Sequence, residues 1–199
     1  LYYSTDTKTW AEWTGNEVNA TEADGIYALY FSGTGNTKIT GGFSNKWTRS
    51  GSSISCTGNI ESLLDCETVA AGQHPVMVNS CYSYMFRDCT SLTTVPSLPA
   101  TTLATRCYYY MFRDCTSLTT VPSLPATTLA DSCYNSMFNG CTSLTTAPSL
   151  PATTLADSCY FYMFNGCTRI KLAISKSREY DKEYRIPKSG NGVTATSAL

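Results

Sequence analysis

The chain has 199 residues, of which 15% are charged, and 14 Lys and Arg stand against 15 Asp and Glu, for a formal net charge of −1. This balance argues against the broad basic surface of a nucleic-acid-binding protein and against a polybasic membrane anchor. No run reaches the ~18–20 apolar residues that a membrane-spanning helix needs. The start at Leu1, without a leader, leads us to expect a mature or trimmed product of a longer protein.

Residues 1–55 predict a small β-rich N-terminal module. Short alternating runs on either side of Asp6-Thr7-Lys8 are typical of a hairpin, and residues 25–31 are typical of a further strand. We expect this module to cover the apolar end of the repeats that follow, as terminal caps do.

Three tryptophans in this module allow a different interpretation. Trp10, Trp13 and Trp47 could form a sugar-stacking platform, which would make residues 1–55 a non-catalytic carbohydrate-binding module. Three tryptophans in a small module more often form its core.

A 26-residue repeat dominates the rest of the chain. Cys81, Cys107, Cys133 and Cys159 follow one another at that interval, and so do Cys89, Cys115, Cys141 and Cys167. A degenerate unit at 64–89 precedes the full units at 90–115, 116–141 and 142–167. The period predicts a repeat array over residues 56–172, followed by a basic tail or truncated continuation at 173–199.

Each repeat has two halves. The first, from Leu92 to Pro99, suits a very short strand with a proline exit. In the second, from Leu103 to Cys115, the invariant positions fall on one arc of a helical wheel and the varying positions on the other. We therefore expect a short helix with one buried face. Stacked units of this kind predict an α/β right-handed solenoid of the leucine-rich-repeat type, with a parallel sheet on its concave side and helices on its convex side.

The repeats resemble a known family. The run LPATTLADSCYNSMFNGC at 124–141 is similar to the BspA-like leucine-rich-repeat surface proteins of Bacteroides-type bacteria, and so are the segments at 3–13, 33–41 and 58–72. The resemblance covers roughly residues 1–170. It implies an exported or cell-surface protein that binds host proteins or matrix, and it offers no catalytic residues to transfer.

The eight cysteines that follow the repeat predict a ladder of buried thiols. Two cysteines eight residues apart on a helix lie ~12 Å from each other, beyond the ~7 Å Cα limit of a disulfide. Bridges between units stay open, and Cys56 with Cys66, outside the full units, is the favoured pair. No C-x-x-C motif supports a zinc site.

We find no motif that predicts an enzyme or a cofactor. The single histidine, His74, lies beside Pro75 in an expected loop, and the chain has no phosphate loop, dinucleotide fingerprint or G-x-S-x-G elbow. The acidic residues of the repeats fall at expected helix starts or on the outward arc. We expect no catalytic site, no metal and no cofactor.

The outward positions of the expected helices form the candidate ligand-binding column on the convex side. It comprises Tyr84, Tyr109, Tyr110, Asn135, Phe161 and Tyr162. Free drift at unconstrained positions would produce the same variation. The threonine-rich strand face, with Thr93, Thr119 and Thr145, is the other candidate surface.

These observations favour a monomeric, surface-displayed binding module. Its expected ligand is a host protein, a matrix component or a glycan, with adhesin-like recognition and no nucleic-acid partner. A structural stalk of a longer surface protein is the main alternative.

Overall fold

The computed structural model describes residues 1–170, so the predicted tail at 173–199 lies outside the described residues. The chain divides into two compact units. One is made of Leu1–Thr37 and Ile60–Val76, and the other of Lys38–Asn59 and the chain from Met77 onward. The predicted boundary at residue 55 is therefore not the division that the structure shows.

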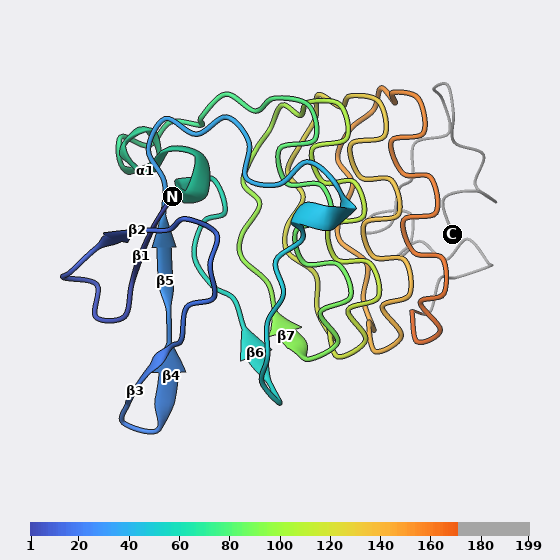
Figure 1. The fold of residues 1–199 in the computed structure, drawn as a ribbon. Helices are drawn as coiled ribbons and strands as arrows, with labels where there is room; N and C mark the ends of the chain where they lie inside the picture. Colours follow the sequence, from blue (N-terminus) through green and yellow to red (C-terminus); the bar gives the residue numbers. More distant parts are fainter. Residues whose placement is uncertain (171–199) are drawn as a thin grey trace. The chain divides into compact units, whose positions relative to one another are not determined.

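The first unit contains the expected hairpin. Strand β1 (Tyr2–Ser4) pairs antiparallel with β2 (Ala11–Glu12) and with β5 (Tyr30–Ser32), in the order β2-β1-β5 (Figure 1). The Asp6 carboxylate closes the turn by accepting the backbone N–H groups of Lys8 and Thr9, each at 2.8 Å. This part of the sequence prediction is confirmed. The single strand expected over 25–31 is interrupted instead, because β4 (Ile26–Ala28) ends before β5 and pairs with β3 (Thr21–Ala23).

Helix α1 (Ser62–Ala70) packs against β5 in the same unit and buries Leu63 and Leu64. The Gly33 N–H donates to the Ser62 carbonyl at 2.9 Å, and the Cys66 N–H donates to the Gly33 carbonyl at 2.8 Å. A side chain at Gly33 would overlap the Leu63 carbonyl oxygen. Glycine is therefore required where β5 ends against α1.

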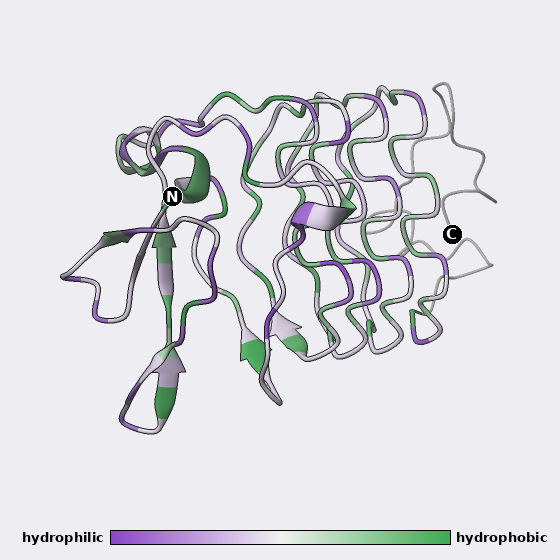
Figure 2. Cartoon of the chain, in the orientation of Figure 1, coloured by the Kyte–Doolittle hydropathy of each residue, from purple (hydrophilic) through white to green (hydrophobic). Residues whose placement is uncertain are grey.

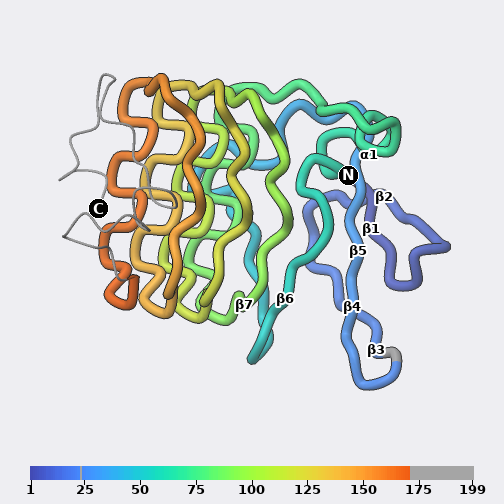
Figure 3. Tube along the Cα trace, turned by 180° about the vertical axis from the view of Figure 1, so that it is seen from behind, coloured from blue at the N-terminus to red at the C-terminus, as the bar shows by residue number. Residues whose placement is uncertain are grey.

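The second unit is a stack of successive coils, one per repeat, which lie side by side in two opposite views (Figures 1 and 3). It opens with the 3-10 helix η1 (Phe43–Asn45) and β6 (Ile54–Ser55), and β6 pairs in parallel with β7 (Leu92–Thr94). Hydrophobic and hydrophilic residues both occur along every coil (Figure 2). We call the second half of each repeat the turn segment. The turn segments of the first to fourth coils are residues 78–89, 104–115, 130–141 and 156–167.

The prediction of a helix in each turn segment is wrong. The segments are chains of tight turns, and no helix is assigned anywhere in them. Odd-numbered N–H groups donate within the coil to the carbonyl three residues back, as Tyr109 does to Arg106 at 3.2 Å. Even-numbered N–H groups donate to the next coil, as Tyr110 does to Asn135 at 3.0 Å. A helix would use nearly all its N–H groups internally and leave no such bonds between coils.

A left-handed residue recurs every fourth position and prevents helix formation. In the second coil Arg106, Tyr110 and Asp114 have φ of 55°, 56° and 60°. The third coil places Ser132, Ser136 and Gly140 in the same conformation. Each non-glycine residue there costs on the order of 1 kcal/mol, which the hydrogen bonds between coils offset.

The predicted buried face is confirmed although the helix is not. Cys107, Tyr108, Met111 and Phe112 have no exposed surface, and their counterparts in the other coils are all buried, with Phe164 the most exposed at 6%. The buried tyrosines stack from coil to coil with ring centroids 5.7–5.9 Å apart, and the buried phenylalanines with centroids 5.3–5.8 Å apart. Two buried positions followed by two more exposed ones fit one face of a short helix as well as they fit this four-residue turn period.

The continuous parallel sheet that the sequence predicts is only partly formed in the described residues. Beyond β6 and β7, a strand-half residue pairs at the isolated bridge Asn59–Ser97, and the other isolated bridge, Thr102–Thr128, follows the strand halves. The two prolines of each strand half lack an N–H group and interrupt a regular ladder.

Residues 38–47 cover the free carbonyl edge of the first coil. The N–H groups of Ile39 and Thr40 both donate to the Cys81 carbonyl, at 2.9 and 3.0 Å, and the Trp47 N–H donates to the Met85 carbonyl at 2.9 Å. These carbonyls are the ones that in later coils accept N–H groups from the preceding coil. Residues 38–47 therefore cap the stack by continuing its hydrogen-bond pattern.

Candidate binding surface

The structure brings three residues of the predicted column together and adds a fourth ring. Tyr84 stacks on Tyr110 with centroids 5.3 Å apart and planes at 6°, and Tyr109 meets Tyr110 edge-on at 4.2 Å. Phe43, from η1, meets Tyr84 edge-on at 6.1 Å and is 51% exposed. We call Phe43, Tyr84, Tyr109 and Tyr110 the ring cluster.

Arginines lie against these rings. The Arg87 guanidinium carbon is 4.5 Å from the Phe43 ring centroid and 5.6 Å from that of Tyr110. Arg113 lies 5.0 Å from the Tyr110 centroid, and Arg106 lies 5.8 Å from that of Tyr109. Stacking on aromatic faces holds each guanidinium in place. The Nε groups of Arg87 and Arg113 donate to Asp88 and Asp114, so it is the terminal N–H groups of these two arginines that remain for a ligand.

The other column members lie elsewhere in the stack. Asn135 is only 8% exposed, and its side-chain oxygen accepts a hydrogen bond from Ser136 Oγ at 2.9 Å. The prediction that Asn135 faces outward as a ligand group is therefore wrong. Phe161 and Tyr162 form a second ring pair with centroids 4.1 Å apart, and Tyr162 is 42% exposed.

The hydroxyls of the ring cluster have different acidities. Burial, reinforced by its contacts with Tyr110, raises the pKa of Tyr109. Although burial acts to raise it as well, hydrogen bonds with Ser136 and Tyr109 and the charges of Arg113 and Arg87 leave the pKa of Tyr110 below its ordinary value. The two phenols are therefore tied into one polar network beside the arginines.

Sequence reasoning missed Phe43 and the arginines as members of this surface. Phe43 is 41 positions before Tyr84, and nothing in its local pattern marks it. The arginines carried a usable signal, because Arg113-Asp114 of the second coil is replaced by Asn139-Gly140 in the third. The threonine face stays exposed at Thr119 and Thr145 and carries no comparable cluster of rings or charges.

The cysteines of the repeats are enclosed, protonated thiols. All ten are free thiols, so the favoured Cys56–Cys66 bridge is not formed in the structure. Burial raises the pKa of Cys133 to about 12 and that of Cys167 to about 11, so both stay protonated at neutral pH. The thiols of Cys115, Cys141 and Cys167 each donate at 3.1 Å to a carbonyl of the preceding coil. The predicted ladder of buried thiols is thus also a ladder of weak hydrogen bonds.

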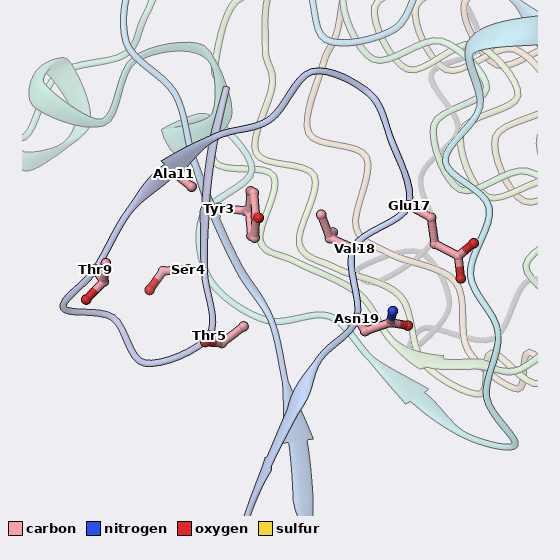
Figure 4. A pocket seen from close by; sticks show the side chains of 8 residues that line it. All are labelled: Tyr3, Ser4, Thr5, Thr9, Ala11, Glu17, Val18 and Asn19. Carbon is pink, nitrogen blue, oxygen red and sulfur yellow. The ribbon is translucent and has the colours of Figure 1, made fainter.

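A hollow of about 420 Å³ lies in the first unit, along β1 and the segment at 17–19 (Figure 4). Tyr3, Glu17 and Asn19 are among its lining residues. No tryptophan lines it. Trp13 packs edge-on against Phe31 at 5.5 Å, as a core residue does, while Trp10 is 42% exposed and Trp47 belongs to the second unit.

His74 is partnered rather than simply solvated. Its Nδ1 lies 2.7 Å from Oε2 of Glu61, a carboxylate that is 1% exposed, while His74 itself is half exposed. The pair anchors the loop after α1.

Within residues 1–170 no cluster of three His, Cys, Asp or Glu side chains could hold a metal ion. None of the helices in that range has the length and apolarity to cross a membrane. In comparisons with known proteins, no family model, no curated protein and no solved structure matches the chain.

Proposed function

We propose that this chain is a leucine-rich-repeat-type solenoid that serves as a surface-displayed binding module, with the ring cluster as its recognition site. The expected ligand remains a host protein, a matrix component or a glycan. Resemblance of the repeats to BspA-like surface proteins supports the extracellular setting.

One observation carries this proposal: the backbone does not need the ring cluster. The third coil has Asn135 and Ser136 where the second has Tyr109 and Tyr110, and both coils keep the same hydrogen bonds and left-handed residues. Aromatic rings that the fold does not need, gathered on a surface beside arginines, are typical of a recognition site.

The structural stalk is the competing function, and a binding screen separates the two. The purified chain is tested against host matrix proteins and a glycan array, beside the variant Tyr84→Ser/Tyr109→Asn/Tyr110→Ser. These substitutions introduce residues that already occupy the equivalent positions of the third coil. We expect a ligand whose binding the variant loses while its circular dichroism and melting remain those of a folded chain.

A matched control removes exposed tyrosines of the first unit, Tyr2→Ser/Tyr27→Ser. Loss of binding in the control alone would move recognition away from the ring cluster. Absence of any ligand would favour the stalk.

A further inference from the structure

We propose that the ring cluster and its arginines bind a linear acidic polysaccharide, with Arg87, Arg106 and Arg113 donating hydrogen bonds to carboxylate or sulfate groups. This inference rests on the proposed function and names the class of ligand for the same site.

The surface around the ring cluster carries excess positive charge in a chain whose formal net charge is −1. Its three arginines and Lys46 pair with two carboxylates, Asp88 and Asp114, and Asp131 of the third coil lies beside Arg106, whose N–H donates to the Asp131 carbonyl at 3.0 Å. Lys46 Nζ bonds Asp88 at 2.6 Å, Arg87 Nε bonds the same carboxylate at 3.4 Å, and Arg113 Nε bonds Asp114 at 3.2 Å. Within the described part of the chain, no ion pair involves Arg106. An anionic ligand would complement this charge.

The ring faces are already occupied, which limits what a ligand can contact. Tyr84 and Tyr110 cover each other, and Arg87 lies over Phe43. Stacking of a neutral sugar on an open aromatic face is therefore disfavoured. The groups left for a ligand are guanidinium edges and phenol hydroxyls, which suit carboxylate, sulfate and hydroxyl oxygens.

The backbone of these coils argues against an extended acidic peptide. In the turn segments of the first two coils, the N–H groups from Ser80 to Cys89 and from Arg106 to Cys115 all donate, either within the coil or to the next one. A peptide added as a strand needs free backbone groups to pair with. A polysaccharide needs only the side-chain donors that this surface presents.

The later coils mark where the site ends. Asn139 and Asn165 occupy the position of Arg113 in the third and fourth coils. Ser132 and Ser158 occupy the position of Arg106. Asp131 and Asp157 add negative charge there. The anionic segment of the ligand is therefore expected to lie over the first two coils.

Equilibrium binding of the full chain to four polymers tests the proposal: heparin, polygalacturonate, neutral dextran and poly-L-glutamate. The site variant is Arg87→Asn/Arg106→Ser/Arg113→Asn, which again uses residues from the later coils. The control variant Lys182→Gln/Arg185→Gln/Lys188→Gln removes the same number of charges from the tail. Circular dichroism and melting verify that both variants fold.

We expect heparin or polygalacturonate to bind the parent chain, dextran not to bind, and added salt to weaken binding. The site variant should bind at least about tenfold more weakly, while the tail variant should stay within about threefold of the parent.

Three outcomes would overturn the proposal: no binding of either acidic polysaccharide, tighter binding of poly-L-glutamate, or loss of binding in the tail variant instead of the site variant. A ligand that depends on Tyr109 and Tyr110 but carries no charge would leave the proposed function standing and refute this inference alone. Absence of any ligand would refute both.

Discussion

The first two coils and the last two share one scaffold but present different surfaces. The second coil carries the partly exposed Tyr109, Tyr110 and Arg113 where the third carries Asn135 and Ser136, which are buried, and Asn139, yet the buried tyrosine, methionine and phenylalanine are the same in both. The backbone is held by hydrogen bonds between coils, which do not depend on outward side chains. Side chains outside the buried core can therefore differ from coil to coil without changing the backbone. The aromatic and cationic residues over the first two coils are an example.

If the buried cores of all coils are equivalent, alkaline pH should destabilise every coil through its buried cysteine thiols. Burial raises the pKa of Cys133 to about 12 from a value of 9.0 in an exposed thiol, and burial also raises the pKa of Cys107. Below pH 9 both folded and unfolded chains keep these thiols protonated. Between pH 9 and 12 only the unfolded chain ionises, so the free energy of unfolding should fall by about 1.4 kcal/mol per pH unit for each such thiol.

Urea melts at pH 8, 9, 10 and 11 measure this loss of stability. It is the largest expected effect because the contributions of several buried thiols add. Cys133→Ala and Cys107→Ala should each reduce the pH dependence of the free energy of unfolding by the contribution of one thiol. A stability that stays level from pH 9 to 11 would show that the thiols are not enclosed in the folded chain.

Truncating the phenylalanine ladder should cost the same in either kind of coil. Phe112 and Phe138 are both fully buried and stack on each other with centroids 5.7 Å apart. Each Phe→Ala substitution should lower the free energy of unfolding by about 3–5 kcal/mol, because it leaves a cavity in the core. Denaturant melts that separate the two variants by more than about 2 kcal/mol would contradict an equivalent scaffold.

A glycine pair shows where neighbouring coils stop being equivalent. Gly140 and Gly166 both have left-handed φ, but a Cβ on Gly140 would overlap the Asp114 carboxylate, whereas a Cβ on Gly166 would meet only Gly140 backbone atoms at 3.4 Å. Gly166→Ala should cost about 1 kcal/mol from its backbone conformation alone. Gly140→Ala should cost about 1 kcal/mol more, and Asp114→Gly should remove that excess. Thermal melts of the single and double variants test the coupling, and additive costs would refute it.

The smallest effect concerns the buried phenols. The hydroxyls of Tyr108 and Tyr160 are enclosed and have no hydrogen-bond partner among the described residues. Because a buried hydroxyl without a partner is costly, Tyr108→Phe and Tyr160→Phe should leave stability unchanged or raise it by up to about 1 kcal/mol. A clear loss of stability in melts of either variant would reveal that its hydroxyl is satisfied in the folded chain.

The sequence by itself determined the 26-residue period, the buried set and the N-terminal hairpin. Identical residues at each 26-residue step can be satisfied only by equivalent environments, so Cys107, Tyr108, Met111 and Phe112 had to face the core together. The outward tyrosines followed from the same reasoning.

Only the tertiary structure decided that the turn segments are not helices. Two buried positions followed by two exposed ones fit a 3.6-residue helix and a four-residue turn equally well over a short stretch. The choice depends on where the even-numbered N–H groups donate, and their acceptors lie 25 residues away in the next coil. The ring cluster was decided in the same way, because Phe43 reaches Tyr84 only after the cap at 38–47 has paired with the first coil.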